Sequence, residues 1–479
     1  TMVSGVSTLP KDKGFPQRHN EGRPSPYLIG LVDPKNYEGL SRSPVNLGLI
    51  RDDIKRFCNT TRRPDDSNLE LAISLASHAF KLYDKVKMVH LNDVFQKDLN
   101  IWSSSPGLPW TQYGYKKKGE LRNHRDIQSI RWFWHKVKLG QKIYAPDSCA
   151  FVRSHIVQGN EFKARAVWGY PATVTLGEAV YALPLIEAYK KHKTPIAYGY
   201  DTATGGCKKI YSEVSAYDIG AAIDFKSFDK TVPAWLIRVA FDILKMNINF
   251  LEYEDYGVAN ASNNFRMFNF IVDYFINTPI RLCNGERYRK HSGVASGSYF
   301  TQLIDSIVNY ILLVWGYLDQ TGKPPEFIRV FGDDSITGSA HKLDLDDFAD
   351  LMKRVGMRIN HVKSAVTKDK TELQFLGFKI NTGYPTKESR HWFASAVFPE
   401  SPDRSWDDAA TRLHGLLHAC AGFDYKFDLF CRWLLTARPD YELRWSVSDI
   451  KYLSMLGIEY KMITKKLPTY LDLMIRVGC

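Results

Sequence analysis

The chain has 479 residues, too many for one small core and enough for a multi-part enzyme, and 44% of them are hydrophobic, which supports a packed interior. Its formal net charge of +12 favours a polyanionic partner such as a nucleic acid, because each neutralised phosphate releases counterions; a merely solvated basic surface is the alternative. The seven cysteines form no C-x-x-C pair, which argues against a zinc site or a disulfide scaffold and favours reduced thiols in a cytosol-like compartment.

The beginning of the chain predicts an extended arm. Residues 9–26 are rich in proline, glycine and basic side chains, and a loose tail is the alternative interpretation. Cations at Lys11, Lys13, Arg18 and Arg23 interrupt any apolar run early, so we expect no signal peptide. No later stretch approaches 18 apolar residues, so we expect no membrane-spanning helix either.

A basic stretch with interleaved aromatic rings follows in the first half of the chain. Phosphates would pair with its cations, and unstacked bases would stack on its rings. For any single residue, however, a solvated charged loop with ordinary core tryptophans is the preferred interpretation. A second basic run lies at 190–193. The first stretch comprises Tyr113, Tyr115, Lys116, Lys117, Lys118, Arg122, Arg125, Arg131, Trp132 and Trp134.

An apolar strand is predicted at 221–225, with Asp224 near its end and Asp229 shortly after it. A helix is expected from about Pro233, because apolar residues recur there at helical spacing. Asp224 would then lie at the carboxyl end of a buried strand, where a parallel neighbour would bring another acid alongside. Taken alone, Asp224 is explained as well by a strand-end cap.

The segment 292–297 is a loop of small residues with two glycines, which lets backbone approach a ligand closely. A helix is predicted to follow, at about 298–318. Within it Thr301, Asp305 and Asn309 recur every four residues and therefore share one face. A polar stripe on a surface helix is the alternative, but the rest of this helix is largely apolar, so we predict a buried helix whose polar stripe has a purpose.

A β-hairpin with an acidic tip is predicted around Gly332, Asp333 and Asp334, because apolar runs flank the acids and glycine supplies the freedom that a tight turn needs. Adjacent carboxylates repel each other unless a cation lies beside them, and Mg²⁺ is the natural candidate, with Mn²⁺ as the second. An ordinary exposed acidic turn is the alternative. With Asp224, the hairpin would supply three carboxylates, enough to hold two metal ions about 3.5–4 Å apart.

The rest of the chain predicts a mixed segment followed by helices. An amphipathic helix over 345–355 is expected to end at Gly356, and 357–359 suggests a strand. From about 396 the pattern becomes helix-rich, with apolar groups around Leu413 and Phe427.

Together, these motifs resemble those of viral RNA-dependent RNA polymerases, most of all those of partitivirus-like double-stranded RNA viruses. Asp224 and Asp229 match motif A; Ser296, Gly297, Thr301 and Asp305 match motif B; Gly332, Asp333 and Asp334 match motif C. Residues 356–364 are similar to motif D, 375–377 to motif E, Lys163 and Arg165 to the basic motif F with Arg153 contributing, and 104–109 to motif G. One position departs from the pattern, since Asp305 stands where the family usually has asparagine.

The resemblance implies a two-metal nucleotidyl-transfer site. Asp224, Asp333 and Asp334 are the expected metal ligands and, with Lys363 as proton donor, the expected catalytic residues; a plain surface lysine is the alternative for Lys363. The expected nucleotide-binding residues are Lys163, Arg165, Asp229, Ser296, Gly297, Thr301, Asp305 and Asn309. The expected RNA-binding residues are Ser105, Gly107, Pro109 and Arg153.

The resemblance also implies the fold class α+β, as a helix-rich right hand with fingers, palm and thumb. We expect an N-terminal arm bridging fingers and thumb at 1–60, fingers at 61–223 with an insertion at 246–290, palm at 224–245 and 291–395, and thumb at 396–479.

The expected function is that of an RNA-directed RNA polymerase that replicates and transcribes a viral RNA genome in the virion interior and the host cytoplasm. Its expected partners are RNA template and product, nucleoside triphosphates and a viral capsid protein. A reverse transcriptase is the nearer rival, but such enzymes usually place a bulky ring where Asp229 stands. A non-catalytic, capsid-associated RNA-binding protein is the other rival, and it leaves three separated carboxylates unexplained.

Overall fold

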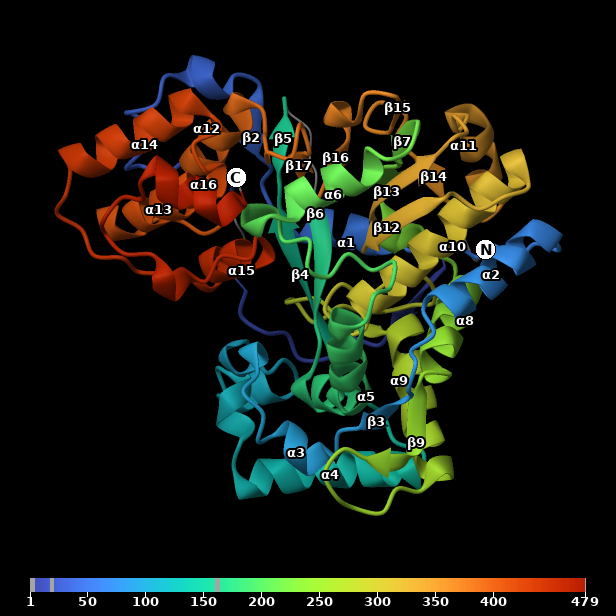
Figure 1. Cartoon of the computed structure of the whole chain (residues 1–479). Helices are drawn as coiled ribbons and strands as arrows, with labels where there is room; N and C mark the ends of the chain where they lie inside the picture. Colours follow the sequence, from blue (N-terminus) through green and yellow to red (C-terminus); the bar gives the residue numbers. More distant parts are fainter. Residues whose placement is uncertain (1–4, 18–20, 160–163, 479) are drawn as a thin grey trace.

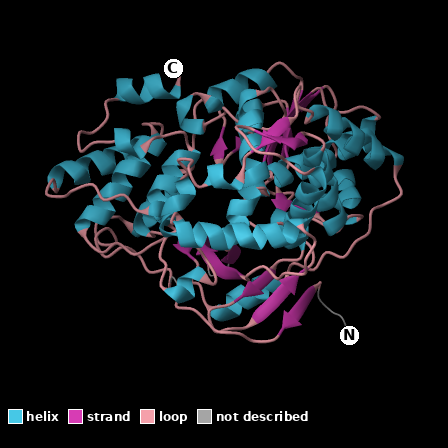
Figure 2. Cartoon of the chain, turned by 90° about the horizontal axis from the view of Figure 1, so that it is seen from below, coloured by secondary structure: helices cyan, strands magenta, loops and turns pink. Residues whose placement is uncertain are grey.

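The computed structural model describes residues 5–17, 21–159 and 164–478, shown along the sequence in Figure 1. Lys163, half of the expected basic motif, lies outside the described residues. Helices predominate, and small sheets lie among them (Figure 2). Within the described ranges, no helix is long and apolar enough to cross a membrane.

A four-stranded antiparallel sheet carries the predicted acidic hairpin. Its order is β12 (Phe327–Phe331), β13 (Asp334–Ser339), β7 (Ile219–Ala222) and β15 (Ala365–Thr367). The strand before Asp224 therefore ends earlier than predicted. The strand before Asp224 was also expected to have a parallel neighbour, and this prediction is wrong in detail. Its neighbour is β13, which lies between β12 and β7 and pairs antiparallel with both.

The helix α10 (Thr301–Thr321) is the most deeply buried element behind this sheet. It packs against α2 (Ser67–Ala79), α8 (Ala234–Lys245) and β12. Leu303, Ile307, Ile311 and Val314 are fully buried in the largest hydrophobic core. The prediction of a buried helix with a polar stripe is thus confirmed, although the helix begins and ends three residues later than expected.

A five-stranded sheet ties the N-terminal arm to residues far along the chain. Its order is β1 (Val6–Leu9), β11 (Arg287–Lys290), β10 (Pro279–Arg281), β4 (Ser148–Ser154) and β6 (Ala164–Gly169). The arm forms the edge strand, paired antiparallel with β11. The backbone of Val6–Leu9 is therefore extended, just before the segment 9–26 for which an extended arm is predicted.

The arm continues from this sheet to the C-terminal helices, which lie at the left of Figure 1. The Ser25 backbone N–H donates to the Val397 carbonyl oxygen (2.7 Å), and its hydroxyl donates to Asp403 (2.6 Å). Leu28 and Val32 are buried in the same core as these helices. The helices are α12 (Ser389–Val397), α13 (Trp406–Cys420), α14 (Tyr425–Ala437), α15 (Val447–Met455) and α16 (Tyr470–Val477).

A helical lobe occupies the bottom of Figure 1. Its helix α4 packs against α9, and α5 packs against both α9 and α3. Its elements are α3 (Leu91–Val94), α4 (His124–Lys138), α5 (Ala172–Lys191), α9 (Ala261–Ile276) and the parallel pair β3 (Val86–Met88) and β9 (Ile248–Tyr253).

The remaining elements are short. They are α1 (Leu47–Lys55), α6 (Gly206–Val214), α7 (Phe228–Thr231), α11 (Leu345–Lys353), β2 (Leu40–Arg42), β5 (Ile156–Gln158), β8 (Phe225–Lys226), β14 (Arg358–Ile359), β16 (Gln374–Phe375) and β17 (Phe378–Lys379). Short 3₁₀ helices lie at Pro34–Tyr37, Asn100–Ser103, Trp110–Tyr113, Lys118–Leu121, Thr202–Thr204, Lys370–Glu372 and Tyr460–Met462.

Candidate active site

The predicted hairpin is present, with a two-residue turn at its tip. Phe331 pairs with Asp334, so Gly332 and Asp333 alone connect β12 to β13. Gly332 has φ +62°, a left-handed conformation in which a side chain would be strained. Asp333 is exposed at the tip, and Asp334 is half-buried at the start of β13.

Two polar residues of α10 hold this hairpin from beneath. The Asn309 amide Nδ2 donates to the carbonyl oxygens of Gly332 (3.0 Å) and Asp334 (3.1 Å). The Ser306 Oγ accepts the Gly332 backbone N–H (2.9 Å). Both side chains are fully buried. Because buried polar groups must find partners, these bonds explain why a largely apolar helix carries a polar stripe.

Asp224 lies two residues beyond the end of β7 and is held through its backbone. Its N–H donates to the Ser364 Oγ (2.9 Å), and its carbonyl oxygen accepts the Asn360 N–H (2.7 Å). Both partners belong to the segment between β14 and β15. The position of the first acid is therefore tied to a segment more than a hundred residues further along the chain.

The three acids share one electrostatic environment. The pKa of Asp334 is raised to about 7, first by burial and then by the neighbouring Asp333 and Asp224 carboxylates. Arg165, on β6, acts in the opposite direction on the same pKa. A divalent cation bound here would offset this excess of negative charge. Carboxylate oxygens are the hard ligands that such a cation prefers.

Among the described residues, no three acidic, histidine or cysteine side chains come close enough together to enclose a metal ion. Magnesium is usually held by one or two carboxylates, and substrate phosphates and water complete its shell. The donor set at the hairpin fits an ion held in that way.

Asp229 and Asp305 form a second acidic pair beside the hairpin, hydrogen-bonded side chain to side chain. The pKa of Asp305 is raised well above its usual range by burial and by the Asp229 carboxylate. The pKa of Asp229 is raised by burial, and the bond from Asp305 opposes that rise. A hydrogen bond between the two carboxyls requires one of them to be protonated, and burial favours the neutral form. A neutral carboxyl at Asp305 can donate a hydrogen bond as an asparagine amide does.

Comparisons with known proteins show which family the chain belongs to. The family model described as viral RNA-dependent RNA polymerase matches residues 31–435, most of the chain. The chain belongs to this family. It is 26% identical over 326 residues to the RNA-directed RNA polymerase of Atkinsonella hypoxylon virus, covering 59% of this chain and 49% of that protein. It is 27% identical over 374 residues to that of Cryptosporidium parvum virus 1, covering 71% and 67%.

A third relative, the RNA-directed RNA polymerase of White clover cryptic virus 1, is 23% identical over 341 residues, covering 65% of this chain and 54% of that protein. The aligned part thus spans about half to two thirds of these relatives. The RNA-dependent RNA polymerase of a human picobirnavirus has a similar fold, with a TM-score of 0.62 at 15% identity, covering 85% of this chain and 77% of that one. The expected α+β right-hand fold with fingers, palm and thumb is confirmed, as is the likeness to partitivirus-like polymerases.

In the motif B loop of this polymerase-family chain, backbone approaches backbone closely. A Cβ at Gly297 would lie 1.9 Å from the Trp168 carbonyl oxygen on β6, so no other residue fits without a shift. The neighbouring Ser296 is exposed, and the Thr301 hydroxyl donates to the Ala295 carbonyl oxygen. The loop is therefore fixed against the strand that carries Arg165.

Two buried titratable residues that the sequence analysis did not single out support this loop. The Glu178 carboxylate on α5 accepts hydrogen bonds from the Ser298 hydroxyl and the Tyr299 N–H, and burial raises its pKa to about 8. The Lys290 Nζ, also fully buried, donates to the Gly293 carbonyl oxygen (3.0 Å). The sequence did contain a signal for Glu178, because it is the single acid within the largely apolar run 172–185, where a buried acid needs a partner.

The two arginines of motif F have different surroundings. Arg153 and Arg165 lie opposite each other on β4 and β6. Arg165 lowers the pKa values of Asp229 and Asp334, so its charge faces both acidic groups. Arg153 instead forms an ion pair with Glu400 (2.8 Å), which connects the sheet to the C-terminal helices.

The motif G residues and Lys363 lie in two other loops. Ser105 is exposed, Pro109 is half-buried, and Gly107 is buried against the Tyr170 carbonyl oxygen. The Lys118 Nζ, which is largely buried, donates to the Ser105 carbonyl oxygen (2.7 Å). Lys363 is exposed next to Ser364. The pKa of His391, on α12, is lowered by burial first, and the Lys363 charge adds a smaller contribution in the same direction.

Proposed function

We propose that this chain is an active RNA-directed RNA polymerase, which joins nucleoside triphosphates on an RNA template to replicate and transcribe a viral RNA genome. One observation supports the proposal: the pKa of Asp334 is raised to about 7 by burial and then by the charges of Asp333 and Asp224, so the three acids act on one another across the β12–β13 hairpin and the end of β7. A structural role would not need three acids in mutual repulsion at one edge of a sheet.

The proposed metal ligands are Asp224 and Asp333, with Asp334 as a secondary ligand or electrostatic support. Two bound Mg²⁺ ions, or Mn²⁺ in their place, would activate the primer 3′-hydroxyl and neutralise the leaving pyrophosphate. Arg165, together with Lys163, would bind the triphosphate, since a guanidinium matches phosphate oxygens and keeps its charge. Lys363 would protonate the leaving group; its position beside Ser364, which bonds to Asp224, supports this role.

The ribose would be read by the pair Asp229 and Asp305, with Ser296, Gly297 and Thr301 shaping the adjoining loop. Asn309 also belongs to the expected nucleotide set, and its two bonds to the hairpin favour a positioning role there. For the RNA strand we propose contacts with Ser105, Gly107, Pro109 and Arg153.

The proposed division into an arm at 1–60, fingers at 61–223, an insertion at 246–290, palm at 224–245 and 291–395, and thumb from 396 has support in the packing. The arm contacts both β11 and α12. Strands from the insertion and the fingers share one sheet. α12, at the boundary between the proposed palm and thumb, packs against α13 of the thumb. A capsid-protein partner, and action in the virion interior and host cytoplasm, complete the proposal.

A primer-extension assay tests the proposal. The chain, its Asp333→Asn variant and a matched surface variant, Asp350→Asn, are supplied with an RNA primer–template and either ribo- or deoxynucleotides, with and without Mg²⁺. We expect metal-dependent ribonucleotide addition that Asp333→Asn abolishes and Asp350→Asn preserves, because the lost ligand charge costs several kcal/mol of transition-state stabilisation. A preference for deoxynucleotides would instead identify a reverse transcriptase. RNA binding without any addition would identify a non-catalytic protein.

A further inference from the structure

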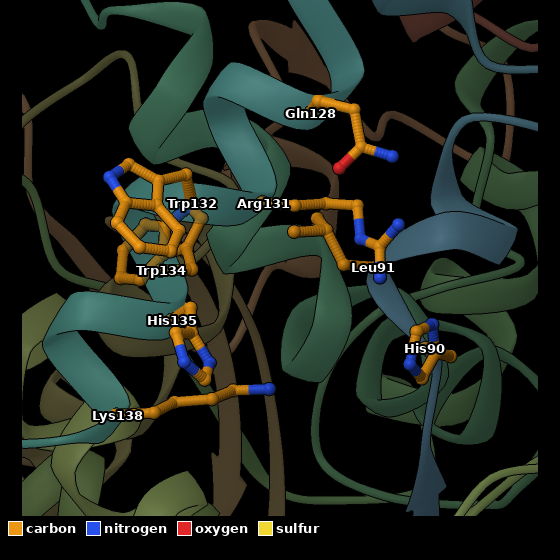
Figure 3. Close-up of a pocket in the computed structure, with 8 residues that line it drawn as sticks. All are labelled: His90, Leu91, Gln128, Arg131, Trp132, Trp134, His135 and Lys138. Atoms are coloured by element: carbon orange, nitrogen blue, oxygen red, sulfur yellow. The ribbon is translucent and has the colours of Figure 1, made fainter. Parts of the chain in front are cut away.

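A cavity of about 480 Å³ lies in the helical lobe, between α4 and the start of α3 (Figure 3). Figure 1 places α3 and α4 at the end of the molecule opposite the strands β12 and β13, so the cavity is separate from the candidate active site. Its volume is within the usual range for small-molecule sites. Its lining residues are His90, Leu91, Gln128, Arg131, Trp132, Trp134, His135 and Lys138.

The α4 wall of this cavity carries hydrogen-bond donors and positive charge. Gln128, Arg131, His135 and Lys138 recur at intervals of three and four residues, so one helix face presents all four side chains. Figure 3 shows this face opposite His90. Among the residues that the structure describes, neither Arg131 nor Lys138 forms an ion pair with a carboxylate, and no acid lines the cavity. Two cations without a protein counterion favour an anionic ligand.

His90 adds a further donor on the opposite wall. Its Nδ1 accepts the Asn92 backbone N–H (3.1 Å), so the neutral ring carries its proton on Nε2. Burial and the Lys138 charge lower the His90 pKa, Asp93 opposes them, and Arg131 lowers it further. Burial and both cations therefore favour the neutral ring, whose Nε2–H is a donor available for an oxygen ligand.

A tryptophan beside these cations offers a surface for a base. The Trp132 side chain is 60% exposed, and its ring stacks on His135 (5.9 Å, 28°) with the Lys136 ammonium 5.2 Å from its centroid. The neighbouring Trp134 is buried, and its indole N–H donates to the Thr173 carbonyl oxygen (2.8 Å). The exposed ring thus stands on a rigid helix. An exposed indole next to cations matches the base-stacking platforms that bind single-stranded nucleic acid.

We propose that this cavity binds a phosphorylated nucleotide at a second site, with phosphate between Arg131, Lys138 and His90 and the base against Trp132. The ligand would be either a free nucleoside triphosphate or the 5′-phosphorylated end of an RNA strand, since both present the same chemistry. Binding here needs no catalysis, so it stands or falls independently of the proposed polymerase activity.

Photo-crosslinking on the full chain locates the ligand and distinguishes its two sources. One arm uses a short 5′-triphosphorylated RNA carrying 5-iodouridine, and the other uses 8-azido-ATP; crosslinked peptides are then mapped. We expect a crosslink within 128–138 from at least one probe. A crosslink from RNA alone would identify a strand-end site, and one from the azido nucleotide alone a free-nucleotide site. If neither probe labels this segment, the proposal is wrong.

Equilibrium binding of the probe that labels the site gives the second measurement. Arg131→Gln with Lys138→Gln should weaken binding of either probe at least about tenfold. Where the probe is the RNA, the slope of log affinity against log salt should also fall by about 1.4, as expected for two lost phosphate contacts to a single strand. The control, Arg125→Gln with Lys142→Gln, removes the same charge from exposed positions that do not line the cavity and should change affinity less than about twofold.

Trp132→Ala should weaken binding about 5- to 150-fold, the range for one lost base stack. Equal affinity in the cavity and control variants, or an unchanged affinity in Trp132→Ala, would show a general polyanion surface and overturn the proposal. The mapping on the unmodified chain remains decisive if a variant fails to fold.

Discussion

Replacing Asn309 by leucine separates two roles for this residue, hairpin support and sugar recognition. Leucine has a similar size but no polar atoms, so the change removes the two bonds from Nδ2 to the Gly332 and Asp334 carbonyl oxygens while leaving little empty space. The Asp334 carbonyl oxygen keeps its ladder bond with the Phe331 N–H, so the Gly332 carbonyl is the one left without a partner, at a cost of about 1–3 kcal/mol. The hairpin can recover part of this energy only by moving toward water, which would displace Asp333 and Asp334.

The consequence is a loss of rate that does not depend on the sugar. If about 2 kcal/mol falls on the catalytic geometry, nucleotide addition slows about 30-fold, at about 1.4 kcal/mol per tenfold. Single-nucleotide incorporation of ATP and dATP on one RNA template measures both rates. We expect both to fall together with an unchanged ratio, accompanied by a lower denaturation midpoint.

Ser306→Ala is the matched control for this change. It removes from α10 the single hydroxyl that accepts the Gly332 N–H of the same hairpin. We expect a smaller loss of stability and rate, again without a change in sugar preference. The reasoning is refuted if Asn309→Leu changes the ratio of ribo- to deoxynucleotide use while stability and the ribonucleotide rate stay near those of the unmodified chain. Asn309 would then contact the sugar.

Three further predictions concern other residues of the site. Lys363→Leu should slow addition by roughly 10²–10⁴-fold with little change in nucleotide affinity; weaker binding at an unchanged maximal rate would make Lys363 a phosphate contact. Asp229→Ala should reduce ribonucleotide use more than deoxynucleotide use, because a site built for a hydroxyl loses its discrimination; an unchanged ratio would place sugar recognition elsewhere. Glu178→Gln should remove a pH dependence of stability. The native Glu178 pKa of about 8 exceeds its ordinary value of 4.5, so the native chain binds the extra proton between these values and loses up to about 5 kcal/mol as pH rises through them. Denaturant unfolding from about pH 5 to 9 measures this slope, and equal slopes in both proteins would contradict the assignment.

The parts of the site that the sequence predicted are the local ones. The acidic hairpin depends on a glycine and on alternating apolar residues within a dozen positions, and α10 depends on a repeat within one helix. The neighbour of β7 could not be predicted in the same way, because the order of strands is decided by pairing across more than a hundred residues. Glu178 bonds to Ser298 from 120 positions away, so only the folded chain reveals that contact.

Arg153 illustrates the same limit for a charged residue. Its position near Lys163 and Arg165 in the sequence suggested that it contributes to the same basic motif, and the strand register does place it opposite Arg165. Its side chain, however, pairs with Glu400, 247 positions further along. A cation's partner depends on which acid the fold brings near it, and nothing in the local pattern encodes that choice.

The helix α10 connects the separate parts of the candidate site. Thr301 bonds to the motif B loop, Asp305 to Asp229 in motif A, and Asn309 to the motif C hairpin. These residues recur every four positions on one face of a helix whose other faces are buried in the largest core. A rigid, close-packed helix cannot move one of these contacts without straining the others. The distance between the acids at the hairpin and the Asp229–Asp305 pair is therefore set by a single element, which explains why these polar side chains lie on so apolar a helix.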